Sequence, residues 1–439
     1  MCLERGCRAV RKCRNSAKRG IIASVMTRTL FTLSALLLGY FMLQMSNGLQ
    51  GSLLAVRADL EGFSATATGL VMSGFFAGMG AGSLLCGRLI ERVGHVRTFS
   101  ALASTASAAT LVHLIVIDPV VWIVARSATG FCFAGLLIAV ESWLNASITS
   151  AERGRLLSIY AMVGMGAGVI GQVLLDSADP QGFMLFVIVS IGLSLALVPT
   201  ALSQAQAPVP DAAQERPSIR HLWSISPFGT VAMGMCGATL GTFFGLAPVF
   251  AQRIGFEPSQ IAYIMAAATL GGLVMQFPVG SLSDRVDRRW ICIGLALAAT
   301  LSMGLLSQAS AQEYAVSLGL AILMGGLLLP TISVVVAHIN DRAPPQALLA
   351  ASGGIVLMQG IGAAAGPFVG GAAMDIFGPR GFLMTLSVAQ GVIVVFAVVR
   401  LALKQGIEPE AKVSYAPMSM TPVEGDLQFA ASESGRRSE

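Results

Sequence analysis

Long apolar stretches alternate with short polar segments along most of this chain. Each stretch holds roughly the 20 residues with which an α-helix crosses the hydrocarbon core of a bilayer. We therefore predict an all-α integral membrane protein with a transmembrane helix in each of twelve stretches, near residues 30–56, 69–87, 98–117, 120–144, 155–175, 183–202, 227–250, 260–280, 290–309, 314–337, 348–371 and 382–401.

The polar segment over residues 203–226 is the longest internal connection and is rich in Gln, Ala and Pro. It divides the predicted helices into two six-helix bundles, over residues 27–202 and 227–403. The polar tail over residues 404–439 has the composition of a disordered segment. Residues 1–26 form a basic extension, which we interpret as an over-extended start before Met26; Met1 as the true start, with a transit-like or lipid-attracted arm, is the alternative.

Composition places this chain in lipid and narrows its function. It is 54% hydrophobic and 12% charged, whereas soluble domains carry about 25% charged residues. The net charge of +5 does not indicate nucleic-acid binding, because the basic residues lie in separate loops rather than in one stripe. The seven cysteines lack metal-ligand spacing, and no phosphate-binding glycine loop or nucleophile–base motif occurs. We expect no metal, no cofactor, no enzymatic activity and no ATP-driven transport.

Lysine and arginine are distributed unequally between the two sides of the predicted membrane segment. The loops on one side contain only Arg57, Arg253 and Arg380, and most other basic residues lie in the segments on the opposite side. Cytoplasmic loops carry the excess of Lys and Arg. We therefore predict a multi-pass protein of the bacterial inner membrane with both termini and the linker in the cytoplasm.

One short pattern occurs in both halves. Gly87–Arg92 (GRLIER) follows the second apolar stretch, and Gly280–Arg285 (GSLSDR) follows the eighth. Thr68–Arg92 aligns without gaps onto Ile261–Arg285. An internal repeat of this kind predicts two pseudo-symmetric bundles with the same internal direction, as in transporters built from parallel repeats.

The alignment also relates the outer ends of the second and eighth helices. Ser64 and Ser259 stand at nearly corresponding positions there. Serine is a favoured N-cap residue. We predict that each serine caps its helix.

The repeated element resembles the signature loop of the major facilitator superfamily, and the resemblance extends over nearly all of residues 27–402. Glu91 replaces the usual Asp in the first copy, and Asp287 replaces the second Gly in the other. Arg126–Gly130 resembles a second signature of the superfamily. The resemblance implies a secondary transporter whose two bundles alternate access about a midplane site.

Two further stretches resemble particular groups within this superfamily. Val140–Asn145 followed by Glu152–Leu157 looks like the YcaD-type bacterial subgroup, and is also similar to the Glu…Arg-Gly-Arg element of sugar porters. Gly362–Gly371 matches a pattern of drug antiporters, but in those proteins it lies in the fifth span. The fifth span here has Gly164–Gly171 without a proline, which weakens an antiporter assignment.

The expected partners are therefore a small organic solute, protons and the bilayer, for a protein that acts as a monomer. Export of drug-like compounds and uptake of a sugar or organic acid both remain open. A membrane receptor or scaffold that has kept the fold and lost transport is the alternative of a different class. The retained signature loops, Arg126 and Glu141 argue against that alternative.

The resemblance implies that the two signature loops latch the cytoplasmic face in one state and release it in the other. Glu141 lies about one turn from the cytoplasmic end of its span, so it is either a partner of a nearby arginine in this latch or a proton carrier. The predicted gate comprises Gly87, Glu91, Arg92, Glu141, Arg153, Arg155, Gly280, Asp284, Arg285 and Arg288.

Polar residues in the apolar stretches are candidates for a solute cavity. In the first stretch Tyr40, Gln44, Asn47 and Gly51 follow at helical spacing, and Gln50 lies beside them. They either face a cavity or form hydrogen bonds between helices. The candidates for the cavity are Tyr40, Gln44, Asn47, Gln50, Arg126, Tyr160, Gln172, Thr239, Thr242, Gln276 and Gln359.

Arg126 lies inside the fourth stretch, away from its ends. It lies six residues beyond the outer start of its stretch, which is about 9 Å at 1.5 Å per residue. It either reaches outward to solvent or faces a cavity that handles protons or anions.

Overall fold

The computed structural model describes residues 34–146, 153–202, 218–308, 313–344 and 347–403. Helix occupies each of the twelve predicted stretches, so the all-α prediction is confirmed. The first is a helix over residues 34–60 (α1), and the others in its half are α2 (Ala65–Val93), α3 (His95–Ile115), α4 (Pro119–Ala146), α5 (Arg153–Val173), η1 (Leu174–Ser177), α6 (Met184–Leu195) and α7 (Leu197–Leu202).

The second half contains α8 (Ile219–Ile225), α9 (Pro227–Arg253), α10 (Pro258–Arg285), α11 (Arg288–Leu306), α12 (Tyr314–Asn340), α13 (Leu348–Phe377) and α14 (Arg380–Leu403). Ten helices in the described part of the chain are long and apolar enough to cross a membrane. The predicted extension over residues 1–26, the tail over residues 404–439 and most of the linker lie outside the described residues.

The structure differs from the prediction in the sixth span and in the linker. The sixth stretch is divided at Ala196 into α6 and α7, because Pro199 lacks an amide hydrogen and its ring would clash with the carbonyl of Leu195 in a continuous helix. The end of the predicted linker forms α8. The hydroxyl of Ser218 caps this helix, and Leu222 is buried beside Gly354 of α13.

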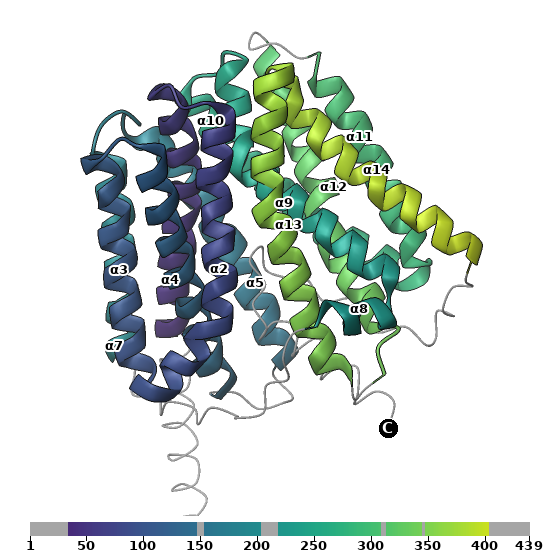
Figure 1. Ribbon diagram of the computed structural model, residues 1–439, viewed down its shortest axis with the longest axis horizontal. Helices are drawn as coiled ribbons and strands as arrows, with labels where there is room; N and C mark the ends of the chain where they lie inside the picture. The colour runs from purple at the N-terminus through teal and green to yellow at the C-terminus, as the bar shows by residue number, and fades with distance from the viewer. Residues whose placement is uncertain (1–33, 147–152, 203–217, 309–312, 345–346, 404–439) are drawn as a thin grey trace, which may run out of the picture.

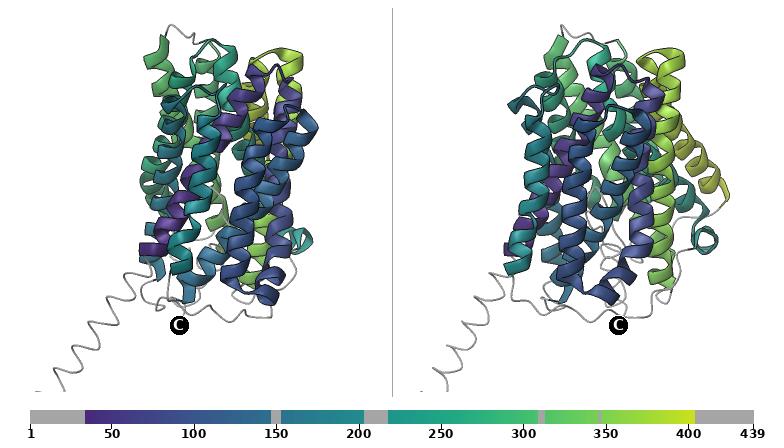
Figure 2. Two further views of the ribbon diagram at one scale, coloured as in Figure 1. Left: turned by 90° about the vertical axis from the view of Figure 1, so that its left-hand side faces the viewer. Right: turned by 60° about the vertical axis from the view of Figure 1, so that its left-hand side comes forward.

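The two halves stand side by side, and their long helices run from one end of the molecule to the other (Figures 1 and 2). We call the end at which α7 stops and α8 begins the linker face. In Figure 1, α9 and α14 slant away from the first half toward this face. Between the halves, α2 packs on α13 and α5 packs on α10. The repeat exchanges these two pairs, since α2 aligns with α10.

The same close helix crossing occurs in both halves. A Cβ at Gly78 of α2 would overlap the carbonyl oxygen of Ser127, and a Cβ at the aligned Gly271 of α10 would overlap that of Ile322. Helices pack this closely in membranes where small residues let two backbones meet. The internal repeat in the sequence is therefore a repeat of packing.

The capping prediction is confirmed at one outer end and wrong at the other. The hydroxyl of Ser64 accepts a hydrogen bond from the amide of Ala67, 3.1 Å away, at the start of α2. In α10 the N-cap is Glu257, whose carboxylate forms a capping box with Gln260. Pro258 fits the first helical position because it needs no donor there, so the helix starts before Ser259.

Hydrogen bonds and an ion pair join the halves at the end opposite the linker face, which we call the closed face. The carboxylate of Asp375 on α13 accepts hydrogen bonds from the backbone amides of Ala65 and Thr66, each 2.9 Å away, at the start of α2. Arg253 and Asp59 form an ion pair of 2.8 Å between α9 and α1. The closed face is therefore held by charge-assisted contacts that cross between the halves.

Candidate functional site

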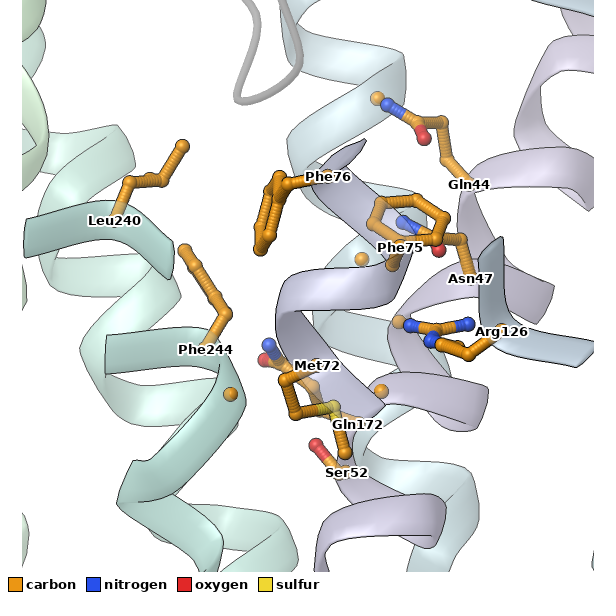
Figure 3. Close-up of a pocket in the computed structure, with 15 residues that line it drawn as sticks. Gln44, Asn47, Ser52, Met72, Phe75, Phe76, Arg126, Gln172, Leu240 and Phe244 are labelled. Atoms are coloured by element: carbon orange, nitrogen blue, oxygen red, sulfur yellow. The ribbon is translucent and has the colours of Figure 1, made fainter. Parts of the chain in front are cut away.

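A cavity lies between the two halves, with about 740 Å³ of empty space that includes adjoining open solvent. Figure 3 shows polar side chains along one wall and apolar side chains along the other. Helices α1, α4 and α5 supply the polar groups, whereas α2 and α9 supply the large apolar ones. The cavity is lined by Gln44, Asn47, Gly48, Gly51, Ser52, Met72, Phe75, Phe76, Arg126, Gly164, Gly168, Gln172, Leu240, Phe244 and Gly245.

Arg126 supplies the charge in this wall. Its side chain is 4% exposed, and its guanidinium carbon lies 4.3 Å from the centre of the Phe75 ring. Nη1 donates a 2.8 Å hydrogen bond to Oε1 of Gln50. A charge at a helix centre costs about 2.5–3.5 kcal/mol even on the lenient insertion scale, so the cavity position needs compensation. The structure thus places Arg126 in the cavity wall rather than in outer solvent.

Gln50 fixes the direction of this guanidinium. Nε2 of Gln50 donates to the hydroxyl of Thr110 over 3.0 Å, and that hydroxyl donates to the carbonyl of Ala106 over 2.9 Å. The amide oxygen of Gln50 therefore points at Arg126. A buried chain of hydrogen bonds joins α4, α1 and α3 and restricts the arginine rotamer.

A second buried chain leads from the cavity to Glu141. Gln44 donates to the hydroxyl of Tyr40 over 3.0 Å, and the Tyr40 and Tyr160 rings stack with centroids 4.0 Å apart. The hydroxyl of Tyr160 donates to Oε1 of Glu141, 3.0 Å away. Glu141 is 5% exposed. The first-helix residues predicted from spacing thus line the cavity or contact residues that do.

Gln172 lines the cavity and also joins the halves. Its Oε1 accepts a 2.9 Å hydrogen bond from the hydroxyl of Thr269 on α10. On the other side, Gly245 of α9 lies against Met72 of α2. These contacts bound the cavity toward the closed face.

The four cavity candidates in the second half lie elsewhere in the structure. Gln390 donates a 3.0 Å hydrogen bond to Thr239, and Ser333 donates a long hydrogen bond of 3.4 Å to Gln276. Thr242 and Gln359 are buried where α9 packs on α13. All four lie among helices of the second half and are not among the residues that line the cavity.

The second-half signature loop is a buried charge cluster. Arg288 is 1% exposed and lies 3.5 Å from Asp284 and 3.1 Å from Asp341. Arg289 pairs with Asp287 at 2.8 Å and donates to the carbonyl of Arg400. The loop therefore ties α10, α11, α12 and α14 together at the linker face.

Asp287 in this loop has a perturbed acidity. Burial alone would raise the pKa of its carboxyl, but hydrogen bonds from the side chain and backbone of Arg289, with the charge of Arg289, lower the pKa below its ordinary value. The carboxylate also accepts from the Arg289 amide and so caps α11.

The first-half copy is arranged differently. Glu91 and Arg92 are exposed, and within the described residues neither forms an ion pair. Gly87 is half-buried, and its counterpart Gly280 is buried, whereas Arg285 is exposed. The side chains of Arg153 and Arg155 lie outside the described residues.

The sequence did not predict the apolar wall of the cavity or the contacts of Asp375 at the closed face. Met72, Phe76 and Phe244 are ordinary apolar residues of a membrane span, so nothing in the sequence distinguishes them from lipid-facing ones. Asp375 had a weak signal, as an acid at the end of an apolar stretch. Its partner Thr66 is far away in sequence and could not be identified.

The family model of the Major Facilitator Superfamily matches this chain over residues 36–257 and again over residues 228–423. The chain belongs to the major facilitator superfamily. In the described part of this superfamily member, no three His, Cys, Asp or Glu side chains converge as metal ligands would. It is a membrane transporter by family.

Similar proteins include uncharacterized transporters of the same superfamily. YcaD of Escherichia coli is 29% identical over 340 residues, which cover 76% of this chain and 86% of YcaD. Ent638_1421 of Enterobacter sp. strain 638 is 29% identical over 259 residues, which cover 58% of this chain and 66% of that protein. The YcaD-type resemblance predicted from the sequence is confirmed.

Two solved structures share the fold. The nucleoside transporter NupG has a TM-score of 0.72 at 13% identity, over 86% of this chain and 100% of its own. A bacterial homologue of the human lysosomal transporter Spinster, inward-facing and occupied, has a TM-score of 0.63 at 16% identity, over 84% of this chain and 94% of its own. At these identities the likeness concerns the fold alone.

Proposed function

We propose that this superfamily member is a secondary active transporter of the bacterial inner membrane, which moves a small organic solute by alternating access and couples its movement to protons. The observation that carries the proposal is the cavity between the halves, bounded on one side by contacts that cross between them. Such a site becomes accessible from one face or the other when the halves rock.

The arrangement corresponds to a state open to the linker face. Asp375, Arg253 and Asp59 join the halves at the closed face. At the linker face, Arg288 and Arg289 pair with residues of their own half. Opening the closed face requires these joining contacts to break, and the signature loops then hold the linker face shut.

The linker face is the cytoplasmic one in this proposal. The loops of the closed face contain only Arg57, Arg253 and Arg380, whereas basic residues are frequent in the segments at the linker face. The cavity of this structure then faces the cytoplasm.

Glu141 is the proposed proton site. It is the one acidic residue that is buried within the described first half, and Tyr40, Tyr160 and Gln44 connect it to the cavity. Intramembrane carboxyls of this kind mark proton pathways in transporters.

Spin-label distances on both faces test alternating access. In a cysteine-less protein we would label Val96→Cys with Val286→Cys near the linker face, and Ile117→Cys with Glu257→Cys near the closed face. We expect two distance populations in each pair, with the two faces changing in opposite directions between about pH 8 and pH 5. One invariant distribution in both pairs would favour the receptor or scaffold alternative.

Maleimide labelling tests the orientation. Arg220 on α8 and Glu257 are exposed on opposite faces. On intact cells an impermeant maleimide should label Glu257→Cys and leave Arg220→Cys unmodified until the cells are opened. The reverse labelling would place the linker outside.

A further inference from the structure

The guanidinium of Arg126 has unused hydrogen-bonding capacity next to empty space. Nη1 is engaged by Gln50, but Nε is buried without a hydrogen-bond partner among the described residues. Nη2 lies on the cavity side, 3.8 Å from where a Cβ at Gly51 would stand, and that Cβ would meet no other atom within 4 Å. The space beside Nη2 is therefore open to a ligand atom, whereas the Phe75 ring covers a face of the guanidinium.

No acidic residue lines the cavity, and Arg126 forms no ion pair within the part of the chain that the structure describes. Glu141, the buried acid of the same half, instead accepts from Tyr160. A buried cation is held in proteins by pairing with an anion. The counter-charge for this cavity is therefore supplied by what enters it.

Neighbouring groups allow a ligand of more than one polar atom. Asn47 and Ser52 line the same wall, and the amides of Gln44 and Gln172 line it while they bond elsewhere. Figure 3 shows Asn47 and Arg126 as neighbours on the same side of the cavity. One fixed cation among neutral amides selects a single negative charge.

The opposite wall requires an apolar body. Phe76, Leu240 and Phe244 lie across the cavity from the polar wall (Figure 3), and Met72 lies below them. Ligand pockets are mostly apolar, with a few polar groups that fix the orientation of the ligand, and this cavity has such a lining. Burial of rings or alkyl chains against this wall is favourable, whereas a second charge there would remain unpaired.

We propose that the transported solute is an organic monoanion, with one carboxylate or similar acidic group that pairs with Arg126 and an aromatic or aliphatic body that packs on Phe76, Leu240 and Phe244. This inference rests on the proposed function and names its substrate class. The guanidinium, which Gln50 holds in place, receives the anion in a charge-assisted hydrogen bond.

The test uses three probes that share one body and differ in charge: phenylacetate, phenylacetamide and phenethylamine, with acetate to represent the anion without its body. Thermal unfolding of the purified full chain in detergent reports binding. We expect phenylacetate to raise the unfolding midpoint in a saturable way. The apparent Kd of each other probe should be about 10- to 100-fold weaker.

Variants assign the effect to the cavity. Arg126→Gln should abolish the phenylacetate response, and Arg126→Lys should retain part of it because the charge remains without the planar fork. Gly51→Ala keeps the arginine and adds a methyl beside Nη2, so it should weaken phenylacetate by about tenfold and still fold. Arg380→Gln, which removes an exposed arginine at the closed face, is the matched control and should respond like the wild type.

Equal responses to phenylacetate and phenylacetamide would overturn the inference, as would an unchanged response in Arg126→Gln or no response to phenylacetate. Spin-label distances on the same preparations separate this outcome from failure of the proposed function. If the two faces open alternately but the protein shows no preference for the anion, the transport proposal is retained and the substrate class is rejected. If phenylacetate binds through Arg126 but the two faces never open alternately, the anion site is supported and the transport proposal is rejected.

Discussion

The two halves bury their charges in different places, although they share a repeat. The first half holds Arg126 in the wall of the central cavity and leaves Glu91 and Arg92 of its signature loop exposed. The second half contributes apolar residues to the cavity and buries Arg288 and Arg289 in its own loop. A repeated backbone can thus place the charge of the cavity in one copy and a cluster of paired arginines in the other.

The proposed state, open to the linker face, would account for part of this difference. Glu91 and Arg92 of the first-half loop are exposed and form no ion pair within the described residues. The second-half loop is held by contacts inside its own bundle, with Asp341 and Arg400. We infer that the first loop is the one whose partners change during transport.

Removal of Arg288 should give the largest effect on stability. The variant Arg288→Ala breaks the buried ion pair with Asp341, and such a break typically costs about 3–5 kcal/mol. Arg92→Ala in the other loop should change the unfolding free energy by about 0.5 kcal/mol or less, because Arg92 is exposed. Chemical unfolding in detergent compares the two, and equal losses would remove the contrast between the loops.

Gly94 and Asp287 occupy aligned positions, and substitution at each should destabilise the protein for a different reason. Gly94 has φ +90° and ψ 158°, a conformation that is essentially restricted to glycine, so Gly94→Ala should cost about 1–3 kcal/mol. Asp287 has φ −53°, and Asp287→Ala should cost about 1 kcal/mol through the lost cap of α11. Chemical unfolding in detergent measures both variants, and equal stability of Gly94→Ala and the wild type would refute the argument about Gly94.

Asp375 and Ser64 both cap α2, but only Asp375 does so from the other half. Asp375→Asn weakens contacts that cross between the halves, so the closed face should open more often, by about fivefold in population for a loss of about 1 kcal/mol. Ser64→Ala should destabilise α2 by a similar amount without a change in the ratio of states. Spin labels at Ile117→Cys and Glu257→Cys report the population. If both variants shift the population of the open closed face equally, then capping of α2 determines that population, and the contact of Asp375 between the halves does not.

The smallest expected effect is on the pH dependence of folding stability. The pKa of Asp287 is lower in the folded protein than in the unfolded chain, so its stabilisation is present above the unfolded pKa and is lost as the pH falls through the folded pKa. Asp287→Asn should therefore make the unfolding midpoint fall less steeply as the pH is lowered through the acidic range in which this carboxyl takes up its proton. The aligned Gly94 carries no charge, so Gly94→Ala should keep the full acid dependence. An unaltered decline in Asp287→Asn would exclude this carboxyl.

The helices could be predicted because apolar length is a property of the sequence alone. Local chemistry could also be predicted where neighbours in sequence decide it, as for Ser64. At Ser259 the argument from symmetry failed, because Pro258 and Glu257 form a better helix start. Helix α8 had a readable signal in Ser218 followed by Ile219, Leu222 and Trp223, but a short amphipathic turn is easily taken for a linker.

The cavity was only partly predictable. The spacing of Gln44, Asn47 and Gly51 identified one face of α1, and these residues do line the cavity. The same reasoning chose Thr239 and Gln276, which bond to Gln390 and Ser333 instead. A polar residue in a span must find a partner, and the sequence does not say whether that partner is a helix or a ligand.

The contacts between α2 and α13 bring two backbones together near the closed face. A Cβ at Gly69 would overlap the carbonyl oxygen of Pro367, and a Cβ at Gly371 would overlap that of Ala65. At 1.5 Å per residue, Val93 beside the signature loop lies about 36 Å along α2 from Gly69. If α2 tilts as a rigid rod about these contacts, a small change of angle there moves the signature loop much further than Ala65, and a single methyl group at Gly69 would force the two backbones apart.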